Sequence, residues 1–434
     1  MPQPPSSALI TIATSGTLGD LWPVLALGGE LRRRGHRVRV CAAASLMGHV
    51  RAAGLDPWPC RPDLGPLRAR EHFACWDHWR MKPENRFLTR PDLVDLPGHC
   101  EDLMAAARDA DLFLFTTTES LGRTAAEKTG LPSLALAVLP IGVSQPPEGS
   151  RPEQIERRLT ATDENGVRYV DLDELIGDLR QGLGLPRRQD AFKVDIVAGI
   201  SRHYCAPLPA PAVNIAFTGF WMYEPPAWRD WRPDREAGRF IEAGEPPLVL
   251  TFSSLPVRDA ATVVRVHARA AALLERKIVM LGGWAGFDGA DAPPDCGDRV
   301  LVRQEMPHGW LFERAAAVIH HGGIGTVARA ATFGLPMLVE PYGNDQFFNA
   351  GRVVKLGLGA AAHPHLLTAD AAARILEQKV LSPATRLRTA ALRERLLEEN
   401  GVAAAADRCE ARLAGARHAG VDHQTCAGRR EPPR

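Results

Sequence analysis

The sequence lacks an excess of charge of either sign. Its 434 residues carry 52 basic and 51 acidic side chains, for a formal net charge of +1. Binding to nucleic-acid phosphates requires a clustered excess of lysine and arginine. The charge balance therefore argues against nucleic-acid binding.

Paired cysteines and long apolar runs are also missing. The eight cysteines are scattered singly, without a C-x-x-C pair, which is typical of a reduced cytosolic chain. The longest apolar stretch, 131–143, is about half a bilayer span and is broken by Pro132 and Pro140. No basic flank precedes the first apolar run. We therefore expect no signal peptide, no transmembrane segment and a cytoplasmic location.

Apolar runs of strand length alternate with helical spacing in both halves of the chain. The first half predicts strands over 8–14, 37–42, 111–116 and 133–138, and helices over 21–34 and 121–129. The second half predicts strands over 248–252, 277–281 and 317–320, and helices over 260–276, 310–316 and 326–333. This repeated rhythm predicts an α/β protein with two Rossmann-like domains, each built on a parallel sheet.

The irregular composition between these halves sets the expected domain boundaries. A proline-rich stretch over 205–213 favours extended chain, and the strand pattern resumes near residue 248. We expect a first domain over 1–220, a linker over 221–240 and a second domain over 241–415. The stretch 371–413 is rich in alanine, leucine, arginine and glutamate and predicts a helix, whereas 416–434 predicts a disordered tail.

The first candidate site is the turn TSGTLGD, which joins the first expected strand to the first helix. Ligands of open parallel sheets gather at the carboxyl ends of the strands, where this turn lies. Gly16 and Gly19 permit close approach of the backbone, and Asp20 would stand at the edge of a cleft. Asp20 would equally suit a helix cap, because Pro23 follows in the first turn. The two roles are compatible.

The second candidate site is VIHHGGIGT, which again follows a strand and precedes a helix. Glycines at 322, 323 and 325 leave backbone N–H groups bare at a helix N-terminus, which favours an anion such as a diphosphate. Strand alternation sends His320 and His321 to opposite faces, so only one of them faces the ligand. A purely structural tight turn remains the alternative, although the histidine pair and Thr326 favour phosphate.

The third candidate site is the polar turn after the strand near residue 337, which holds Asp345 and Gln346. A carboxylate beside an amide suits the vicinal hydroxyls of a sugar, because Asp accepts hydrogen bonds while Gln both donates and accepts them. A solvated turn or a helix cap is the alternative.

Taken together, these motifs resemble the GT-B nucleotide-sugar glycosyltransferases, the superfamily of plant UDP-glycosyltransferases, sterol glucosyltransferases and bacterial antibiotic and rhamnolipid glycosyltransferases. The opening GTLGDLWP is similar to the G-[TS]-x-G-D-x-x-P start of the family. Residues 307–359 follow the bacterial signature, including HHGGIGT, the G-x-P triplet, the D-Q pair and the NAGRV run. The motifs occur in the family's order and cover most of the chain.

The resemblance implies two Rossmann-like domains that face a central cleft, with a C-terminal helix that crosses back to the first domain. It implies that the first domain binds a small, largely apolar hydroxyl acceptor and the second binds a UDP- or dTDP-sugar. The implied reaction is inverting hexose transfer, without cofactor or metal. The catalytic residues are then Asp20 as general base and His321 at the phosphates. The residues expected to bind the donor are Gly16, Gly19, Ser253, Ser254, Val302, His321, Gly322, Gly323, Gly325, Thr326, Asp345 and Gln346.

Arg329 departs from the plant pattern, in which a glutamate bonds the ribose hydroxyls. Bacterial members often lack that glutamate, so UDP and dTDP both remain open, with a slight tilt toward dTDP. Two D-x-D patterns, at 109–111 and 171–173, would suit a metal in the other main glycosyltransferase fold. Their positions beside expected helix ends favour structural roles.

Several questions stay open at this point. The aromatic residues Phe73, Trp76, Trp79 and Phe87 fit an acceptor pocket or a small satellite core equally well, as do Trp221, Tyr223, Trp228 and Trp231 near the linker. A nucleotide-sugar epimerase or a non-catalytic auxiliary protein of the same fold are the rival functions. A monomer and a homodimer are both compatible with the sequence.

Overall fold

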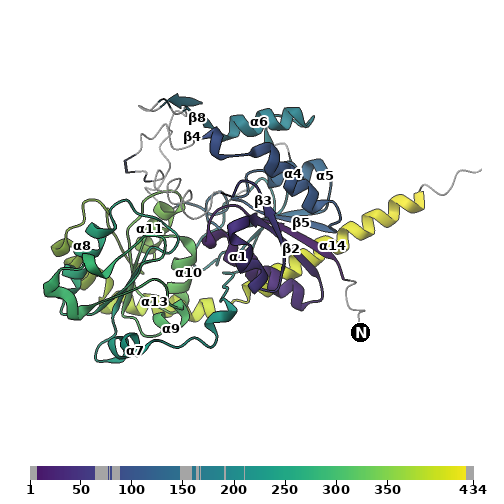
Figure 1. Cartoon of the computed structure of the whole chain (residues 1–434). Helices are drawn as coiled ribbons and strands as arrows, with labels where there is room; N and C mark the ends of the chain where they lie inside the picture. Colours follow the sequence, from purple (N-terminus) through teal and green to yellow (C-terminus); the bar gives the residue numbers. More distant parts are fainter. Residues whose placement is uncertain are drawn as a thin grey trace, which may run out of the picture.

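The protein consists of two α/β domains that lie side by side in the computed structural model (Figure 1). The structure describes residues 7–63, 77, 79–80, 88–146, 159–162, 166, 168–189, 192–209 and 211–426. The expected two-domain arrangement of parallel sheets is confirmed.

The first domain is built on a seven-stranded parallel sheet, in the order β10-β9-β6-β5-β1-β2-β3. The strands are β1 (Leu9–Ala13), β2 (Arg37–Ala43), β3 (Asp56–Cys60), β5 (Leu112–Thr116), β6 (Ser133–Ala137), β9 (Ile196–Ala198) and β10 (Ile215–Phe217). The helices are α1 (Leu18–Arg33), α2 (Met47–Ala52), α4 (Leu96–Ala107) and α5 (Gly122–Thr129). All five residues of β1, β5 and β6 are buried, as expected for central strands with both faces covered.

A small second sheet joins the first domain on the side where the sequence offers no recognisable pattern. It is antiparallel, in the order β4-β8-β7, with β4 at Leu88–Thr89, β7 at Thr160–Thr162 and β8 at Arg168–Asp171. Helix α6 (Leu172–Gly182) follows β8 directly and is capped by Asp171. These strands have two to four residues, too few to leave an alternating hydrophobic signal.

The second domain is built on a six-stranded parallel sheet, in the order β13-β12-β11-β14-β15-β16. The strands are β11 (Leu248–Thr251), β12 (Ile278–Leu281), β13 (Val300–Arg303), β14 (Ala317–His320), β15 (Met337–Val339) and β16 (Gly359–Ala361). The helices are α7 (Arg235–Glu242), α8 (Ala260–Leu273), α9 (His308–Phe312), α10 (Ile324–Thr332) and α11 (Asp345–Lys355).

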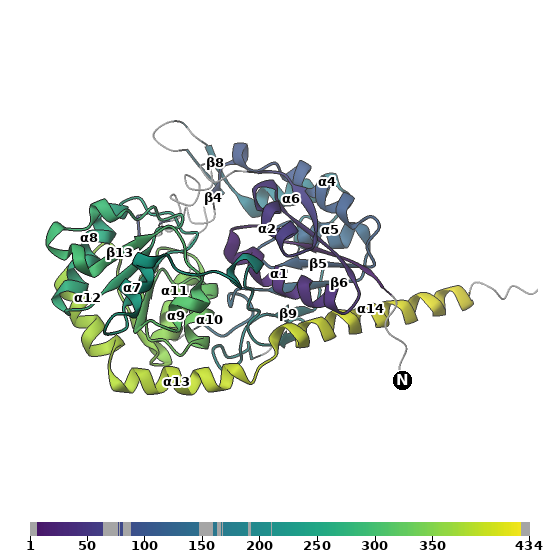
Figure 2. The same cartoon turned by 60° about the horizontal axis from the view of Figure 1, so that its bottom comes forward.

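The C-terminal helices connect the two domains. Helix α12 (Ala369–Ile375) and the π-helical turn 376–380 are followed by α13 (Pro383–Leu397), which packs on α10, and by α14 (Gly401–Cys426), which packs on α1. Figure 2 shows α13 running along the second domain and α14 along the first. The chain therefore crosses back to the first domain, and the boundary expected at residue 415 does not separate the domains in space.

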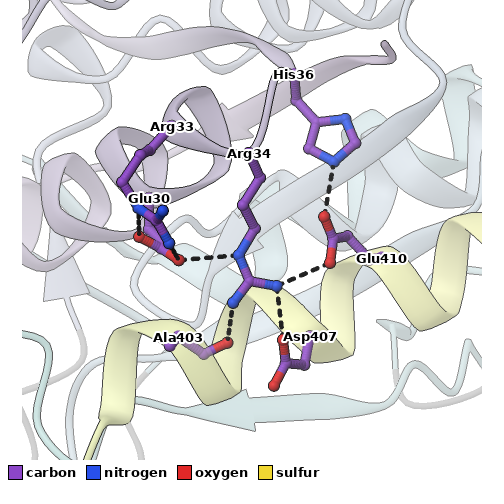
Figure 3. A network of polar contacts seen from close by, with 7 residues as sticks. All are labelled: Glu30, Arg33, Arg34, His36, Ala403, Asp407 and Glu410. Atoms are coloured by element: carbon purple, nitrogen blue, oxygen red, sulfur yellow. Dashed lines mark hydrogen bonds and ion pairs between the residues drawn. The ribbon is translucent and has the colours of Figure 1, made fainter. Parts of the chain in front are cut away.

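A polar network fixes α14 on α1 (Figure 3). Arg34, at the C-terminus of α1, donates to Asp407 Oδ1 at 2.6 Å, to Glu410 Oε2 at 2.8 Å and to the carbonyl of Ala403 at 3.0 Å. The ring of His36 lies 3.1 Å from the other Glu410 oxygen. The crossing helix is thus attached to the helix that begins at the Asp20 turn.

Three expected boundaries differ from the structure. Helix α7 begins at Arg235, inside the expected linker, because Asp234 accepts a hydrogen bond from the backbone of Ala237 and caps it. The helix expected over 371–413 is broken where Ser382 and Pro383 start a new helix. Helix α14 extends to Cys426 and so includes residues 416–426, for which the sequence predicted a disordered tail. Residues 427–434 lie outside the described residues.

Candidate active site between the two sheets

Asp20 lies in the first turn of α1, directly after the carboxyl end of β1. The backbone N–H of Thr17 donates to Asp20 Oδ2 at 2.9 Å, while the Thr17 side chain bonds back to the first turn, which forms a capping box. The capping role expected for Asp20 is therefore present. Most of the Asp20 surface is buried, and a smaller part remains exposed.

Glycine at position 16 is required by this carboxylate. Gly16 has a φ of +120°, and a Cβ there would lie 2.2 Å from Asp20 Oδ2. Gly19 is exposed, and its N–H donates to Thr17 Oγ1 at 3.2 Å. Gly16 thus makes room for the acid, whereas Gly19 belongs to the cap.

A buried charged pair supports this turn from below. Ser15 Oγ donates to Glu119, and the two carboxylate oxygens of Glu119 lie 2.9 and 3.0 Å from Nε2 of His99. Burial opposes the imidazolium, but the Glu119 charge outweighs it and raises the pKa of His99 to about 9. Burial likewise opposes the carboxylate, yet His99 lowers the pKa of Glu119. The pair is therefore ionised at neutral pH.

Removing this pair is expected to destabilise the fold in a pH-dependent way. We expect His99→Gln to cost about 3 kcal/mol near pH 6, because a buried carboxylate loses its partner. The stability due to the raised pKa of His99 is complete below 6.5 and is lost as the pH rises through about 9. Denaturant unfolding of both proteins at pH 6 and pH 9.5 measures this. A difference that grows toward pH 9.5 would contradict it.

The glycine turn after β14 forms a backbone cradle at the start of α10. The N–H of Gly322 donates to His320 Nδ1 at 3.1 Å, so the fully buried His320 holds the turn from inside the sheet. Gly322 has a φ of +97°, and a Cβ there would lie 2.8 Å from Val339 Cγ1. Gly323 is the N-cap residue of α10, and Gly325 is exposed with open space above it. The backbone of Ile324 bonds to Asp345 and that of Thr326 to the carbonyl of Gly323, so Gly323 and Gly325 have the N–H groups suited to an anion.

The ring of His321 packs edge-on against Phe252, with ring centroids 6.1 Å apart. Its Nε2 lies so close to Gly323 that a Cβ there would approach it to 2.4 Å. Burial lowers the pKa of His321 to about 4, so the ring is neutral at pH 7, and its buried Nδ1 has no hydrogen-bond partner. A neutral imidazole has one N–H to donate to an anion.

Two hydroxyls extend the cradle on the β11 side. Thr326 Oγ1, in the first turn of α10, lies 3.4 Å from Ser253 Oγ. Ser253 follows β11 with a positive φ of 51°, and Ser254 stands next in the same partly exposed turn. Ser253 and Thr326, both expected to bind the donor, therefore lie side by side.

Asp345 and Gln346 begin α11, after the carboxyl end of β15. The Asp345 carboxylate accepts from Asn349 Nδ2 at 3.0 Å and from the backbone of Ile324, the first residue of α10. Gln346 Oε1 accepts from the N–H groups of Tyr342 and Gly343 at 2.7 and 3.1 Å. The side-chain oxygen of Gln346 thus bonds within its own turn. The side-chain NH2 group is then the part of Gln346 that can contact a sugar.

Asp20 of the first domain and Asp345 of the second interact through their charges. Helix α1 lies on the side of its domain next to α10 and α11 in both views (Figure 1 and Figure 2). Burial raises the pKa of Asp345 to about 7, and the charge of Asp20 adds to this shift. Burial raises the pKa of Asp20 to about 6. The charge of an acid of the first domain thus acts on the pKa of an acid of the second.

Other residues singled out from the sequence make contacts that support the fold. Val302 lies within β13 and packs, partly buried, against the core cluster beneath α8. Arg329 is buried, and its guanidinium donates to the carbonyl of Tyr223 at 2.6 Å. Position 329 therefore anchors the linker on α10. In the D-x-D pattern at 109–111, Asp109 pairs with Arg39, and Asp111 accepts a hydrogen bond from the backbone N–H of Leu9.

The aromatic residues near the linker pack between the domains. Trp22 of α1 contacts Trp228 with ring centroids 5.4 Å apart, and Trp228 lies 6.3 Å from His308 of α9. Trp221 is buried in the core of the first domain. Trp79 donates to the carbonyl of Pro341 at 2.6 Å, across the domain boundary. Phe73, Trp76 and Phe87 lie outside the described residues.

Three residues of the candidate site were not predicted from the sequence. Glu119 and His99 support the Asp20 turn, and Asn349 joins Asp345 to the cradle through a bond to the carbonyl of Gly322. Asn349 stands in the NAGRV run that resembles the family signature, so its position carried a signal, but its function was not identified. Within the described part of the chain, no three His, Cys, Asp or Glu side chains form a group suited to a metal, and no helix is long and apolar enough to cross a membrane.

Comparison with known proteins identifies the family of the chain. Residues 290–411 match the family model of the erythromycin biosynthesis protein CIII-like C-terminal domain. The chain is 31% identical to glycosyltransferase GtfE of Amycolatopsis orientalis over 417 residues, which covers 92% of this chain and 96% of the relative. It is 30% identical to the vancomycin aglycone glucosyltransferase of the same organism, over 88% and 92% of the two chains.

Solved structures agree on the fold. The glycotransferase of kitacinnamycin superposes with a TM-score of 0.69 at 21% identity, over 94% of this chain and all of the other. Glycosyltransferase VinC, in complex with dTDP, superposes with a TM-score of 0.63 at 17% identity, over 94% and 99%. Two parallel sheets, a glycine cradle and an acid from the opposite domain accompany this similarity. The chain belongs to the UDP-glycosyltransferase superfamily and is a glycosyltransferase of the GT-B fold.

Proposed function

We propose that this glycosyltransferase moves a hexose from a UDP- or dTDP-sugar to a hydroxyl of a small, largely apolar acceptor, with inversion at the anomeric carbon. The observation that carries the proposal is that α1, whose first turn holds Asp20, lies beside α10 and α11, which begin at the glycine cradle and at Asp345 (Figure 1 and Figure 2). The charge of Asp20 also contributes to the raised pKa of Asp345, which supports this proximity. The names of the relatives, which include a vancomycin aglycone glucosyltransferase, support an acceptor of the natural-product class.

In the proposed step, Asp20 takes the proton of the acceptor hydroxyl. Its Oδ2 accepts from the N–H of Thr17, and the side chain of Thr118 also bonds to the carboxylate, so these contacts hold the group in place. The acceptor oxygen forms its bond to the anomeric carbon as the bond from that carbon to the diphosphate breaks. A positioned general base of this kind contributes about a hundred- to ten-thousand-fold to the rate.

The leaving diphosphate gains negative charge during this step. The N–H groups at the start of α10, the neutral ring of His321 and the hydroxyl of Thr326 are fixed before the reaction by the sheet and the helix. Preorganised donors of this type stabilise developing charge without reorganisation. Asp345 and the NH2 group of Gln346 hold the hydroxyls of the transferred sugar. The mechanism as proposed needs no metal and no cofactor.

The nucleotide is a UDP or dTDP moiety. A ribose-binding carboxylate at position 329 is replaced by an arginine that bonds to Tyr223. This arrangement supports a slight preference for dTDP, whose deoxyribose has one hydroxyl fewer, and the similar VinC structure is a dTDP complex. We expect the acceptor to enter from the first domain.

The raised pKa values predict how the rate depends on pH. Asp20 must be unprotonated to act as a base, and Asp345 must be ionised to accept from a sugar hydroxyl. With pKa values of about 6 and about 7, kcat/KM should rise as the pH increases from 5 to 8. Initial rates over this range, with stability checked at each pH, measure the effect. A rate that is already maximal at pH 5 would contradict this assignment.

The function itself is tested with the purified protein. We expect a panel of UDP- and dTDP-sugars with hydroxylated aglycones to yield a glycoside by mass spectrometry, with one nucleoside diphosphate released for each glycoside. The configuration of the product's anomeric centre tests inversion. Interconversion of nucleotide sugars without acceptor would favour an epimerase instead, and binding without either reaction would favour an auxiliary protein.

A further inference from the structure

Asn349 joins two parts of the donor site. Its Nδ2 donates to the carbonyl of Gly322 at 2.8 Å and to Asp345 Oδ2 at 3.0 Å. Gly322 belongs to the cradle and Asp345 to the turn that faces the sugar. Because Asn349 has no exposed surface, each of these bonds is sheltered from water. One amide group therefore sets the distance between the phosphate cradle and the sugar acid.

The orientation of this amide depends on a residue of the other domain. The hydroxyl of Tyr204 donates to Asn349 Oδ1 at 3.1 Å. Tyr204 follows β9 of the first sheet and is fully buried. An amide side chain has a carbonyl oxygen and an NH2 group that exchange places when it flips. A hydroxyl that donates to Oδ1 fixes the NH2 group toward Gly322 and Asp345.

Tyr204 is itself fixed by the second domain. The guanidinium of Arg352, also on α11, donates through Nε to the carbonyl of Tyr204 at 2.9 Å and through a second nitrogen to the same oxygen. Tyr204 and Asn349 are 145 residues apart in sequence. These contacts thus hold the segment after β9 against α11.

We propose that Tyr204 is a positioning residue of the donor site, which orients the amide of Asn349 so that the cradle and Asp345 bind one nucleotide sugar together. This assignment rests on the proposed function. It concerns a residue of the acceptor-binding domain that acts on donor binding without touching the donor. Loss of the Tyr204 hydroxyl leaves Asn349 Oδ1 buried without a partner, which is costly and frees the amide to turn.

The test compares ligands that report on different parts of the site. UDP and dTDP alone reach the cradle, whereas UDP-glucose and dTDP-glucose also reach Asp345. Calorimetric titration of all four into Tyr204→Phe is expected to give about fivefold weaker binding of the diphosphates and a further loss for the glucose conjugates. Asp345→Asn is expected to weaken only the conjugates. Asn349→Asp, which keeps the acceptor for Tyr204 but loses both donations, is expected to weaken every ligand by more than tenfold.

Thr11→Val serves as the matched control. Thr11 is a fully buried residue of β1 whose hydroxyl donates to the carbonyl of Ala106 at 3.1 Å, remote from α11. It should lower the melting temperature without changing donor affinity. Equal donor affinity in wild type and Tyr204→Phe, or an equal loss in Thr11→Val, would overturn the assignment of Tyr204. If the wild type binds none of the four ligands, the proposed function fails and this assignment fails with it.

Discussion

Exchange of Asp20 for asparagine is expected to reduce sugar transfer by about a hundred- to ten-thousand-fold while donor affinity stays close to that of the wild type. Asparagine keeps an oxygen that accepts from the N–H of Thr17, so the capping box and the first turn of α1 survive. It cannot take the proton of the acceptor hydroxyl. The loss should therefore appear in kcat, measured as glycoside formed, and not in calorimetric donor binding.

Asp95→Asn is the matched control for this variant. Asp95 is also an aspartate at a helix N-terminus in the first domain, where it accepts from the backbone of Gly98 at 3.0 Å and caps α4. The same chemical change should there leave transfer within about twofold, since a surface cap contributes mainly to stability. Asp20→Asn with normal turnover, or with much weaker donor binding, would remove Asp20 from the role of base.

Replacement of His321 by alanine is expected to weaken donor binding and to lower kcat by about a hundred- to a thousand-fold. The His321 ring is neutral because burial lowers its pKa to about 4, so it supplies an N–H whose hydrogen bond strengthens as charge develops on the leaving diphosphate. Removal of the ring also leaves a gap beside Gly323. Steady-state kinetics with varied donor separate the two effects.

His36→Asn provides the comparison for loss of a buried histidine. His36 is almost fully buried and bonds to Glu410 of α14, on the opposite end of α1 from Asp20. It should cost stability without changing kcat or donor KM. If His321→Ala resembles this control in its kinetics, the histidine supports the turn and does not contact phosphate.

The regular parts of the fold were predictable because burial on both faces imprints a continuous apolar run. The strand expected over 317–320 coincides with β14, and that expected over 8–14 differs from β1 by one residue at each end. The small sheet β4-β8-β7 was not predictable, because its strands are too short to alternate. The interruption of the last helical stretch at Ser382 was missed, because alanine-rich sequence on both sides hides the new cap.

The candidate site also has parts that the sequence predicted and parts that it did not. Asp20 and the cradle lie within contiguous motifs, so their spacing in sequence is nearly their geometry. The supporting contacts join residues that are distant along the chain, such as Glu119 with His99, 20 residues apart, and Tyr204 with Asn349, 145 residues apart. Only folding brings such partners together. The sequence likewise predicted both oxygen and nitrogen of Gln346 for the sugar, whereas its oxygen closes the turn at Tyr342.

The sequence predicted two compatible roles for Asp20, a helix cap and a general base. The structure adds the physical reason that both roles fit one residue. The cap occupies one carboxylate oxygen, and burial raises the pKa of the group to about 6, which is a suitable basicity near neutral pH. A capping aspartate on an exposed helix would have a lowered pKa instead.

The most direct test of the account is a crystal structure of the chain with dTDP or UDP bound. We expect the diphosphate at the N-terminus of α10, with oxygens bonded to the backbone of Gly323 and Gly325, to His321 and to Thr326, and with the carboxylate of Asp20 facing it from the first domain. A nucleotide bound away from the glycine turn, or a diphosphate in the turn with Asp20 directed into the protein interior, would contradict the central claim.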